Sequence, residues 1–312
     1  MSTPLVTVGV VTYNSAEFIE ETLDSIYNQD YQNIELVVSD DCSTDSTVEI
    51  CRSWISKHES RFNGAKLVTT EKNTGVSGNS NRVLKEAHGE WYKCFDGDDV
   101  LDSHAISNYV KFVNEHLEAV HVAAKVSFIN GKSVEDRDGI ISKYVCSDSF
   151  NAMRQSKVIT KFLFIACPTY FVNTKVLRDI GGFDERYPMQ EDYPLLIKLI
   201  KAGFKLYYID EITVYYRITD HSISHSKSND SFFSNNNIRT IKQYKLAYRS
   251  DGASFLWRSL NSFSLFLSNL VINSGNNRKS FISSLCYKLY RGLDPYLWAK
   301  RYYYNKAKAS LK

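Results

Sequence analysis

Short apolar runs alternate with helically spaced apolar residues through the first third of the chain. The runs are rich in β-branched residues, which indicates strands, and they fall at 5–12, 34–39, 66–70 and 91–95. Helical spacing of apolar residues predicts helices between them, at about 18–27, 44–58 and 78–87. A repeated strand and helix unit packs as a parallel, doubly wound sheet with helices on both faces. The predicted fold class is therefore α/β.

The second half of the chain loses this regularity. Strands are predicted at 120–130, 162–172 and 206–217, and a helix at 192–202 ends at Gly203. From about residue 232 onward the pattern is helical, with polar breaks near 235–237 and 274–277. The longest uncharged stretch, 259–277, is interrupted by Ser and Asn, which predicts a packed or interfacial helix rather than a membrane-spanning one.

Composition agrees with a folded globular protein. Hydrophobic residues make up 43% and charged residues 23% of the 312 positions, enough for one large domain or a main domain with an appendage. The first residues lack a basic region before a short β-branched run, which predicts a strand rather than a secretion signal. The six cysteines show no paired spacing. We therefore expect reduced thiols in a cytoplasmic protein.

Charge is distributed unevenly along the chain. Residues 238–312 carry 14 Lys or Arg against Asp251 and Asp294, a local net charge of +12, while the whole chain carries only +3. A basic, aromatic-rich tail on an acidic body indicates an anionic partner, such as a membrane surface, a lipid pyrophosphate or nucleic acid. A solvated helical face remains the alternative on charge alone.

Polar residues follow the predicted strands, at the edge where open α/β sheets bind ligands. They are Thr12-Tyr13-Asn14 after the first strand, Asp40 to Asp45 after the second and Asp96-Gly97-Asp98-Asp99 after the fourth. No glycine-rich dinucleotide loop or Walker loop follows the first strand. This absence disfavours dinucleotide-dependent oxidoreductases and P-loop nucleotidases.

Clustered carboxylates repel one another and any phosphate unless a cation is present. Mn²⁺ or Mg²⁺ held by one or two carboxylates can bridge substrate phosphates and neutralise a leaving diphosphate, so we expect one of these ions here. The alternative for Asp96, Asp98 and Asp99 is a turn in which Asp caps the next helix. Asp45 is more typical of such a helix cap than of a chemical role.

Seven short motifs along residues 5–226 resemble those of family 2 glycosyltransferases of the GT-A fold, the type that builds bacterial surface polysaccharides such as O-antigen. In chain order they are VTYN (11–14), VVSDDCSTD (37–45), NTGVSGNSN (73–81), FDGDD (95–99), GGFDE (181–185), QED (190–192) and YYR (215–217). No single motif is specific for this family, but the occurrence of all seven in this order is. A GT-A transferase using a nucleotide-sugar donor is what the resemblance implies.

The resemblance also implies roles for individual residues. Asp41 would accept hydrogen bonds from the nucleobase, and Asp98 would be the main metal ligand. The other candidate donor-binding residues are Thr12, Tyr13, Asn14, Asn81 and Asp96, and the other candidate metal ligands are Asp96, Asp99 and His221. Two positions depart from the family pattern. Ser80 stands where an Arg is common, and Thr219 where a His is common, with His221 or His225 as substitutes.

Members of the resembled family invert the anomeric centre by direct displacement, with Asp192 of this chain as the catalytic base. Gly182 and Glu191 would lie on the acceptor side. From the residues alone, Asp192 could equally be a helix N-cap, because Tyr193 and Pro194 follow it.

The domain organisation expected from these observations is a catalytic domain at 1–230 and a basic, aromatic-rich helical extension at 231–312. Within the former, about 1–100 would bind the nucleotide sugar, with a UDP-linked donor as the expected class, and about 101–230 the acceptor. A glycan or lipid-linked acceptor at the inner face of the membrane would suit the basic tail better than nucleic acid. The alternatives are a non-catalytic glycan-binding or scaffold protein and a sugar nucleotidyltransferase, although the latter usually needs a glycine- and Arg-rich loop after the first strand.

Overall fold

The computed structural model describes residues 2–129, 137–165, 167–218, 254–274 and 280–310. It divides into two compact units. The first unit comprises Met1–Gln155 and Phe164–Arg217, and the second comprises Ser156–Leu163 and Ile218–Lys312.

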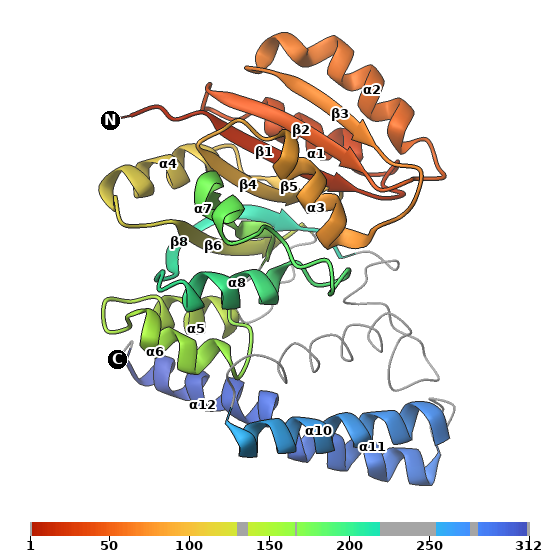
Figure 1. Ribbon diagram of the computed structural model, residues 1–312, viewed down its shortest axis with the longest axis vertical. Coiled ribbons are helices and arrows are strands. Elements are labelled where there is room, and N and C mark those ends of the chain that lie inside the picture. Colours follow the sequence, from red (N-terminus) through yellow and green to blue (C-terminus); the bar gives the residue numbers. More distant parts are fainter. Residues whose placement is uncertain (1, 130–136, 166, 219–253, 275–279, 311–312) are drawn as a thin grey trace. The chain divides into compact units, whose positions relative to one another are not determined.

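A sheet with the strand order β3-β2-β1-β4-β7-β6-β8-β5 organises the first unit (Figure 1). The strands are β1 (Val6–Thr12), β2 (Ile34–Asp40), β3 (Ala65–Thr69), β4 (Trp91–Asp96), β5 (Val100–Leu101), β6 (His121–Phe128), β7 (Phe171–Asn173) and β8 (Tyr207–Tyr216). Strands β1 to β4 pair in parallel, as do β6 and β8, whereas β7 runs antiparallel to both its neighbours and β5 antiparallel to β8. The predicted α/β class with a mostly parallel sheet is confirmed.

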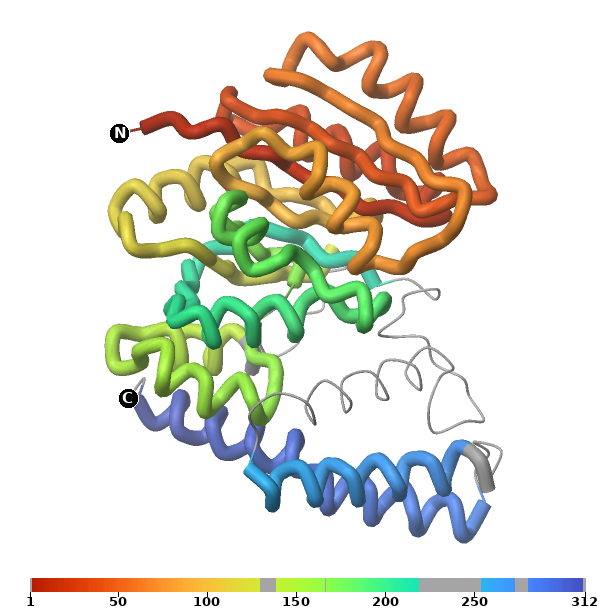
Figure 2. Tube along the Cα trace, viewed as in Figure 1, coloured from red at the N-terminus to blue at the C-terminus, as the bar shows by residue number. Residues whose placement is uncertain are grey.

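Helices alternate with the parallel strands along the chain (Figure 2). Those of the first unit are α1 (Ile19–Tyr27), α2 (Thr47–His58), α3 (Gly75–Glu86), α4 (Ala105–Glu115), α5 (Arg137–Val145), α7 (Thr174–Asp179) and α8 (Asp192–Lys201), and α6 (Ala152–Ile159) crosses from the first unit into the second. Short 3-10 turns occur at Glu59–Arg61 and Cys167–Thr169.

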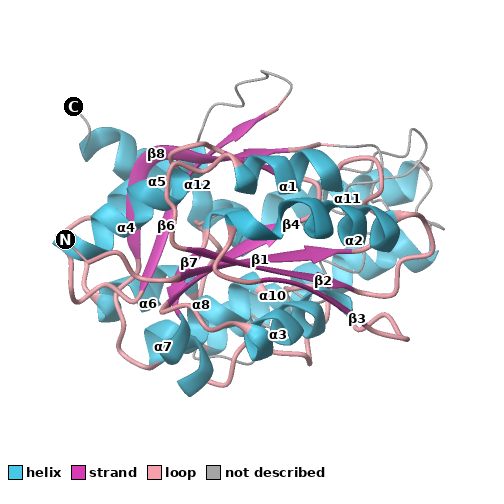
Figure 3. Cartoon of the chain, turned by 90° about the horizontal axis from the view of Figure 1, so that it is seen from above, coloured by secondary structure: helices cyan, strands magenta, loops and turns pink. Residues whose placement is uncertain are grey.

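The four parallel strands are covered on both faces (Figure 3). On one face, Val8 and Val10 of β1 join buried residues of α1, α2 and α4 in the main hydrophobic core. On the other face, Gly9 lets α3 approach closely, because a Cβ at Gly9 would lie 2.5 Å from a methyl group of Val83 and 2.7 Å from the ring of Tyr92. This close packing holds α3 against the sheet beside the strand ends.

The prediction of a strand at 162–172 was wrong for most of that segment. The backbone N–H of Phe162 bonds to Val158 O at 3.3 Å, which continues the end of α6, and a 3-10 turn at Cys167–Thr169 precedes the short β7. Phe162 and Phe164 are buried all the same. An apolar run can therefore be buried as a loop, which periodicity alone does not distinguish from a strand.

The second unit contains the helices α10 (Phe255–Asn269), α11 (Phe281–Leu293) and α12 (Pro295–Ser310), with a π-helical turn at Leu270–Ser274. Its core contains Leu267, Val271 and Tyr290. Phe162 packs against α12, with ring centroids 6.2 Å from Tyr296 and 5.7 Å from Tyr303. Among the described residues, no helix has the length and apolar character needed to span a bilayer. Residues 238–253 of the basic tail lie outside the described part.

Candidate active site

Three predicted site residues meet at the carboxyl edge of the parallel strands. Thr12 pairs with Asp40 in the β1 and β2 register, and Val11 pairs with Asp96 in the β1 and β4 register. The backbone N–H of Asp41 donates to Thr12 O at 2.9 Å, and the N–H of Gly97 donates to Val11 O at 2.9 Å. Thr12, Asp41 and Asp96 therefore lie side by side, because parallel strands end at the same edge of the sheet.

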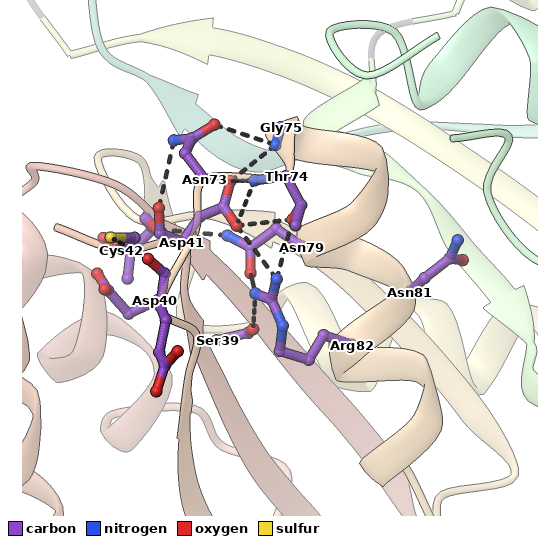
Figure 4. A network of polar contacts seen from close by, with 12 residues as sticks. Ser39, Asp40, Asp41, Cys42, Asn73, Thr74, Gly75, Asn79, Asn81 and Arg82 are labelled. Carbon is purple, nitrogen blue, oxygen red and sulfur yellow. Dashed lines mark hydrogen bonds and ion pairs between the residues drawn. The ribbon is translucent and has the colours of Figure 1, made fainter. Parts of the chain in front are cut away.

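The carboxylate of Asp41 is surrounded by hydrogen-bond donors at the start of α3 (Figure 4). It accepts from the N–H of Thr74 at 2.9 and 3.1 Å, from the N–H of Gly75 at 2.8 Å and from the Thr74 hydroxyl at 2.7 Å. Backbone N–H groups at a helix N-terminus favour a negative charge. Thr74 and Gly75 thus hold the Asp41 carboxylate in place. A ligand that donates to this carboxylate would do so alongside these bonds.

Arg82 completes this network, and it was not among the predicted site residues. Its guanidinium forms an ion pair with Asp41 at 3.2 Å and donates to the Ser39 hydroxyl at 3.1 Å, to Asn79 Oδ1 at 2.9 Å and to the Thr74 hydroxyl at 2.9 Å. The available signal was its position on the helix predicted at 78–87, two residues after Ser80, where the family pattern has its Arg.

The neighbouring loop after β1 is ordered by Asn14. This residue adopts a positive φ of 51°, its Oδ1 accepts from the N–H of Thr44 at 2.8 Å, and its N–H donates to the Ser43 hydroxyl at 2.8 Å. The side chain of Tyr13 is 49% exposed beside the buried Thr12. Asn14 therefore shapes the loop, whereas Tyr13 presents its ring at the surface.

A second acidic group follows β4, at Asp96–Asp99, and we call it the acidic turn. Arg217, at the end of β8, holds this turn through Nε, which donates to Asp98 O at 2.8 Å, and through its N–H, which donates to Asp99 Oδ1 at 2.9 Å. The other oxygen of Asp99, Oδ2, is buried without a hydrogen-bond partner. An orphaned carboxylate oxygen in a buried site is costly.

Burial and mutual repulsion act on the carboxyl groups of the acidic turn. Burial, followed by the charge of Asp98, raises the pKa of Asp96 to about 7. Burial raises the pKa of Asp98 against the opposing charge of Arg217, and burial with the charges of Asp96 and Asp98 raises the pKa of Asp99 well above its ordinary value. Each raised pKa means that the ionised carboxylate is disfavoured in this environment. A further cation nearby would stabilise it.

Lys93 supplies one positive charge beside the acidic turn. It is fully buried on β4, its Nζ donates to Cys94 O at 2.6 Å and to Pro168 O, and it lies 5.0 Å from the ring centroid of Phe95. Burial lowers the pKa of Lys93 to about 8, while the carboxylates of Asp96 and Asp99 oppose that shift. One lysine does not balance three carboxylates.

Glu191 and Asp192 approach the acidic turn from the start of α8. Burial, then the charges of Asp192 and Asp96, raise the pKa of Glu191 to about 8, and the charge of Asp192 also contributes to the raised pKa of Asp96. Asp192 is buried, and its Oδ1 accepts from the N–H of Tyr193 at 2.6 Å. Glu191 occupies the N-cap position of α8 without a side-chain cap bond, so the Asp192 carboxylate satisfies a backbone N–H of the first turn in addition to any chemical role.

The remaining predicted residues lie elsewhere. Gly182 occupies a turn before α8 with a positive φ of 58°. Asn81 points away from the Asp41 network (Figure 4) and toward this turn, and its Oδ1 accepts from the N–H of Phe183 at 2.8 Å. Thr219, His221 and His225 lie outside the described residues.

The residues present fit a divalent cation at the acidic turn. Asp96 and Asp98 offer oxygen ligands, which Mg²⁺ and Mn²⁺ prefer, and the buried Oδ2 of Asp99 still requires a positive partner. In the described part of the chain, no three His, Cys, Asp or Glu residues are grouped as a metal site. Mg²⁺ sites commonly use one or two carboxylates together with substrate phosphates, so two protein ligands suffice.

Residues 7–181 match the profile of the protein family described as Glycosyl transferase family 2. The chain belongs to this family. The resemblance drawn from the seven motifs is therefore confirmed, and the acidic turn lies within the matched residues.

Several characterised and uncharacterised proteins share this similarity. An uncharacterized glycosyltransferase of Haemophilus influenzae is 28% identical over 94% of this chain and 88% of its own length. The Escherichia coli protein WfaP, named UDP-Glc:alpha-D-GlcNAc-diphosphoundecaprenol beta-1,3-glucosyltransferase, is 26% identical over 76% of this chain and 86% of its own length.

Solved structures confirm the GT-A fold. The crystal structure of Staphylococcus aureus TarS 1–349 with UDP-GlcNAc superimposes with a TM-score of 0.62 at 20% identity, covering 98% of this chain and 91% of that one. The mannosyltransferase PcManGT from Pyrobaculum calidifontis, in complex with GDP-Man and Mn²⁺, gives a TM-score of 0.63 at 21% identity, covering 98% and 86%. At these identities the likeness concerns the fold.

Proposed function

We propose that this family 2 glycosyltransferase transfers a sugar from a UDP-linked donor to an acceptor hydroxyl, with inversion of the anomeric centre. The observation that carries the proposal is the meeting of the acidic turn with Asp192 and Glu191 beside the Thr12 and Asp41 edge. A UDP-linked donor is supported by the name of WfaP and by the complex of TarS with UDP-GlcNAc.

Donor binding is assigned to the edge formed by Thr12, Asp41 and the loop after β1. Asp41 would contact the nucleobase from its anchored position, while Tyr13 would offer an exposed aromatic ring for stacking. Asn14 keeps this loop in place through its bond to Thr44. The nucleotide would then extend along the strand ends toward Asp96.

Asp98 and Asp96 would hold Mn²⁺ or Mg²⁺ together with the donor diphosphate. When bound, the ion neutralises the charge that develops on the leaving diphosphate. The Mn²⁺ in the PcManGT complex supports a divalent ion in this fold. Asp99 is less suited to ligation by both oxygens, because its Oδ1 already accepts from the backbone of Arg217.

Asp192 is the proposed catalytic base. Its carboxylate removes the proton from the acceptor hydroxyl while the hydroxyl oxygen forms a bond to the anomeric carbon, and the bond from that carbon to the diphosphate oxygen breaks. The electron pair of the broken bond leaves with the diphosphate. Glu191 and Gly182 would border the acceptor, since both lie in the segment around the start of α8.

A lipid-linked or other glycan acceptor in bacterial polysaccharide synthesis is the proposed substrate class, in line with the diphosphoundecaprenol acceptor in the name of WfaP. The proposed division is a catalytic domain at 1–230 and a basic extension at 231–312. This extension would contact anionic membrane at the inner face, where each basic residue contributes about 1 kcal/mol. Flotation with anionic vesicles at low and high salt tests this contact, and equal absence of binding at both would refute it.

A thermal-shift panel of nucleotide sugars, with and without Mn²⁺, tests the central proposal. A bound donor stabilises the native state by mass action, so we expect UDP-linked sugars to raise the melting temperature by several degrees and Mn²⁺ to increase the shift. No shift with any nucleotide at millimolar concentration would contradict the proposal. Shifts without metal-dependent hydrolysis of the donor would instead favour a non-catalytic binding protein.

A further inference from the structure

Helix α3 contacts a second part of the first unit besides the Asp41 network, namely residues 181–190, which we call the 181–190 turn. The side-chain amide of Asn81 donates to Phe183 O at 2.9 Å and to Glu185 Oε1 at 2.8 Å. Its carbonyl oxygen accepts from the N–H of Phe183 at 2.8 Å. Three of the hydrogen bonds that an Asn side chain can form are therefore made to this one turn.

Two more points along α3 hold the same turn. The hydroxyl of the buried Ser77 donates to Tyr187 O at 2.7 Å. Gly75 has a φ of +79°, and a Cβ there would lie 2.4 Å from Pro188 O. A Cβ at Gly182 would likewise lie 2.6 Å from Asn81 Oδ1. Gly75 thus permits a close backbone approach to Pro188, and Gly182 leaves room for the amide of Asn81.

The turn is also tied to the helix that follows it. Lys198 of α8 reaches back, and its Nζ donates to Gly182 O at 2.8 Å. Asp192, the first residue of α8, follows the turn after a single intervening residue, Glu191. A displacement of the turn would therefore displace the Asp192 carboxylate, whose distance from the reacting hydroxyl determines the rate.

We propose that Asn81 is a positioning residue, which fixes the 181–190 turn and through it Asp192, rather than the donor contact that the family resemblance implies. The inference rests on the proposed role of Asp192. It predicts an effect on the chemical step without an effect on nucleotide affinity. A donor contact would have the opposite consequence.

The test compares three variants of the full chain. Asn81→Ala removes the three bonds to the turn, and Ser77→Ala removes one bond at a different point. Asn33→Ala is the control, because Asn33 precedes β2 at the amino end of the strands, where its Nδ2 donates to Thr3 O at 2.8 Å and its Oδ1 accepts from Asn63 Nδ2 at 2.6 Å. Loss of these two bonds controls for general destabilisation of the first unit.

Three measurements are made on each variant: the Kd of UDP with Mn²⁺ by calorimetry, amide hydrogen exchange of 184–193, and turnover of the UDP-sugar that gives the largest thermal shift. For Asn81→Ala we expect the Kd to stay within about twofold, exchange of 184–193 to rise, and kcat to fall on the order of 10- to 100-fold at unchanged donor KM. Ser77→Ala should follow in the same direction with smaller changes.

A UDP Kd weakened on the order of tenfold or more, with exchange of 184–193 unchanged, would identify Asn81 as a donor contact and overturn the proposal. A rise in exchange across the whole first unit, matched by Asn33→Ala, would show that Asn81 contributes only to general stability and would overturn the proposal. If the wild-type chain binds no nucleotide, the proposed function fails by itself. The exchange of 184–193 would still decide whether Asn81 holds the turn.

Discussion

Two acidic groups lie at the same edge of the sheet, and they differ in what surrounds them. At Asp41 the chain supplies both backbone donors from the start of α3 and the cation of Arg82. At the acidic turn, Arg217 and Lys93 face the buried Asp99 and two half-buried carboxyl groups, one oxygen of Asp99 has no hydrogen-bond partner, and desolvation raises the pKa values of Asp96 and Asp99. At Asp41 the chain itself supplies the positive partners, so no external cation is needed there, whereas the acidic turn is short of positive charge and is suited to bind a cation from outside.

The largest expected effect, a loss of transfer activity, concerns Asp192, which belongs to neither of the two acidic groups. Asp192→Asn keeps the size of the side chain but loses the proton acceptor, so transfer should fall by about 10²- to 10⁴-fold, roughly 3 to 5 kcal/mol of barrier. Nucleotide affinity by calorimetry and the urea midpoint should stay near wild type. Turnover close to wild type would remove Asp192 from the chemistry, and Glu191 would become the next candidate.

The next effect concerns the acidic turn itself. Asp98→Asn removes a charged oxygen ligand, and we expect UDP affinity in Mn²⁺ to weaken on the order of 10- to 100-fold, while affinity in EDTA changes little. Calorimetry in Mn²⁺ and in EDTA measures the difference. Equal losses under both conditions would mean that Asp98 contacts the nucleotide without a metal, and the contrast between the two acidic groups would disappear.

Substitutions of Arg82 test the other acidic group, in which the chain itself supplies the cation beside Asp41. Arg82→Ala leaves the buried Asp41 with its backbone donors but without its cation, so the free energy of unfolding should fall by about 1 to 3 kcal/mol. Arg82→Lys keeps the charge, but its three N–H donors on one nitrogen cannot reach all four partners of Arg82, so its stability should lie between those of Arg82→Ala and wild type. Urea denaturation measures both variants. A stability unchanged in Arg82→Ala would show that the backbone donors alone suffice for Asp41.

The smallest effect concerns Glu35, a second buried carboxylate whose hydrogen-bond donors are supplied by the chain. It accepts from the hydroxyl of Thr7 at 2.5 Å and from the N–H of His88 at 2.8 Å. Burial acts to raise the pKa of Glu35, but these bonds and that of the His88 ring outweigh it, so the pKa lies below its ordinary value of about 4.5. The ionised form therefore stabilises the fold above that value, and this stabilisation is lost as the pH falls through the folded pKa.

The variant Glu35→Gln tests whether this stabilisation is lost as the pH falls. Near pH 7 it should cost about 1 kcal/mol of unfolding free energy, and the cost should shrink as the pH is lowered below about 4.5. Urea titrations of both proteins between pH 7 and pH 3 measure the difference. A cost that stays constant over this range would show that the bonds do not depend on ionisation.

The parts of this site that depend on strand ends could be predicted from the sequence. Thr12, Asp41 and Asp96 follow runs whose β-branched composition locates the strands, and the parallel register then places them at one edge. The helix at Asp192 was predicted from its apolar spacing and Gly203. Periods of two and of 3.6 residues carry this information locally, so no knowledge of distant contacts is needed.

The parts that depend on contacts across the fold could not be predicted. Arg82 reaches Asp41 because α3 packs against Gly9, and nothing near position 82 records that approach. The amide of Asn81 bonds to Phe183, 102 residues along the chain, and local periodicity does not record that contact either. Helix α7 was also missed, since its 6 residues show too little of the helical period to be recognised.

The route of α6 has a practical consequence for anyone expressing part of this protein. Residues Ser156–Leu163 belong to the second unit although the first unit resumes at Phe164, so the chain enters the second unit twice. A shortened chain that stops after Arg217 would retain Phe162 but lose Tyr296 and Tyr303, its aromatic partners. The apolar surface left bare would favour aggregation during purification. Truncated versions for crystallisation should therefore keep α12, or replace Phe162 with a polar residue.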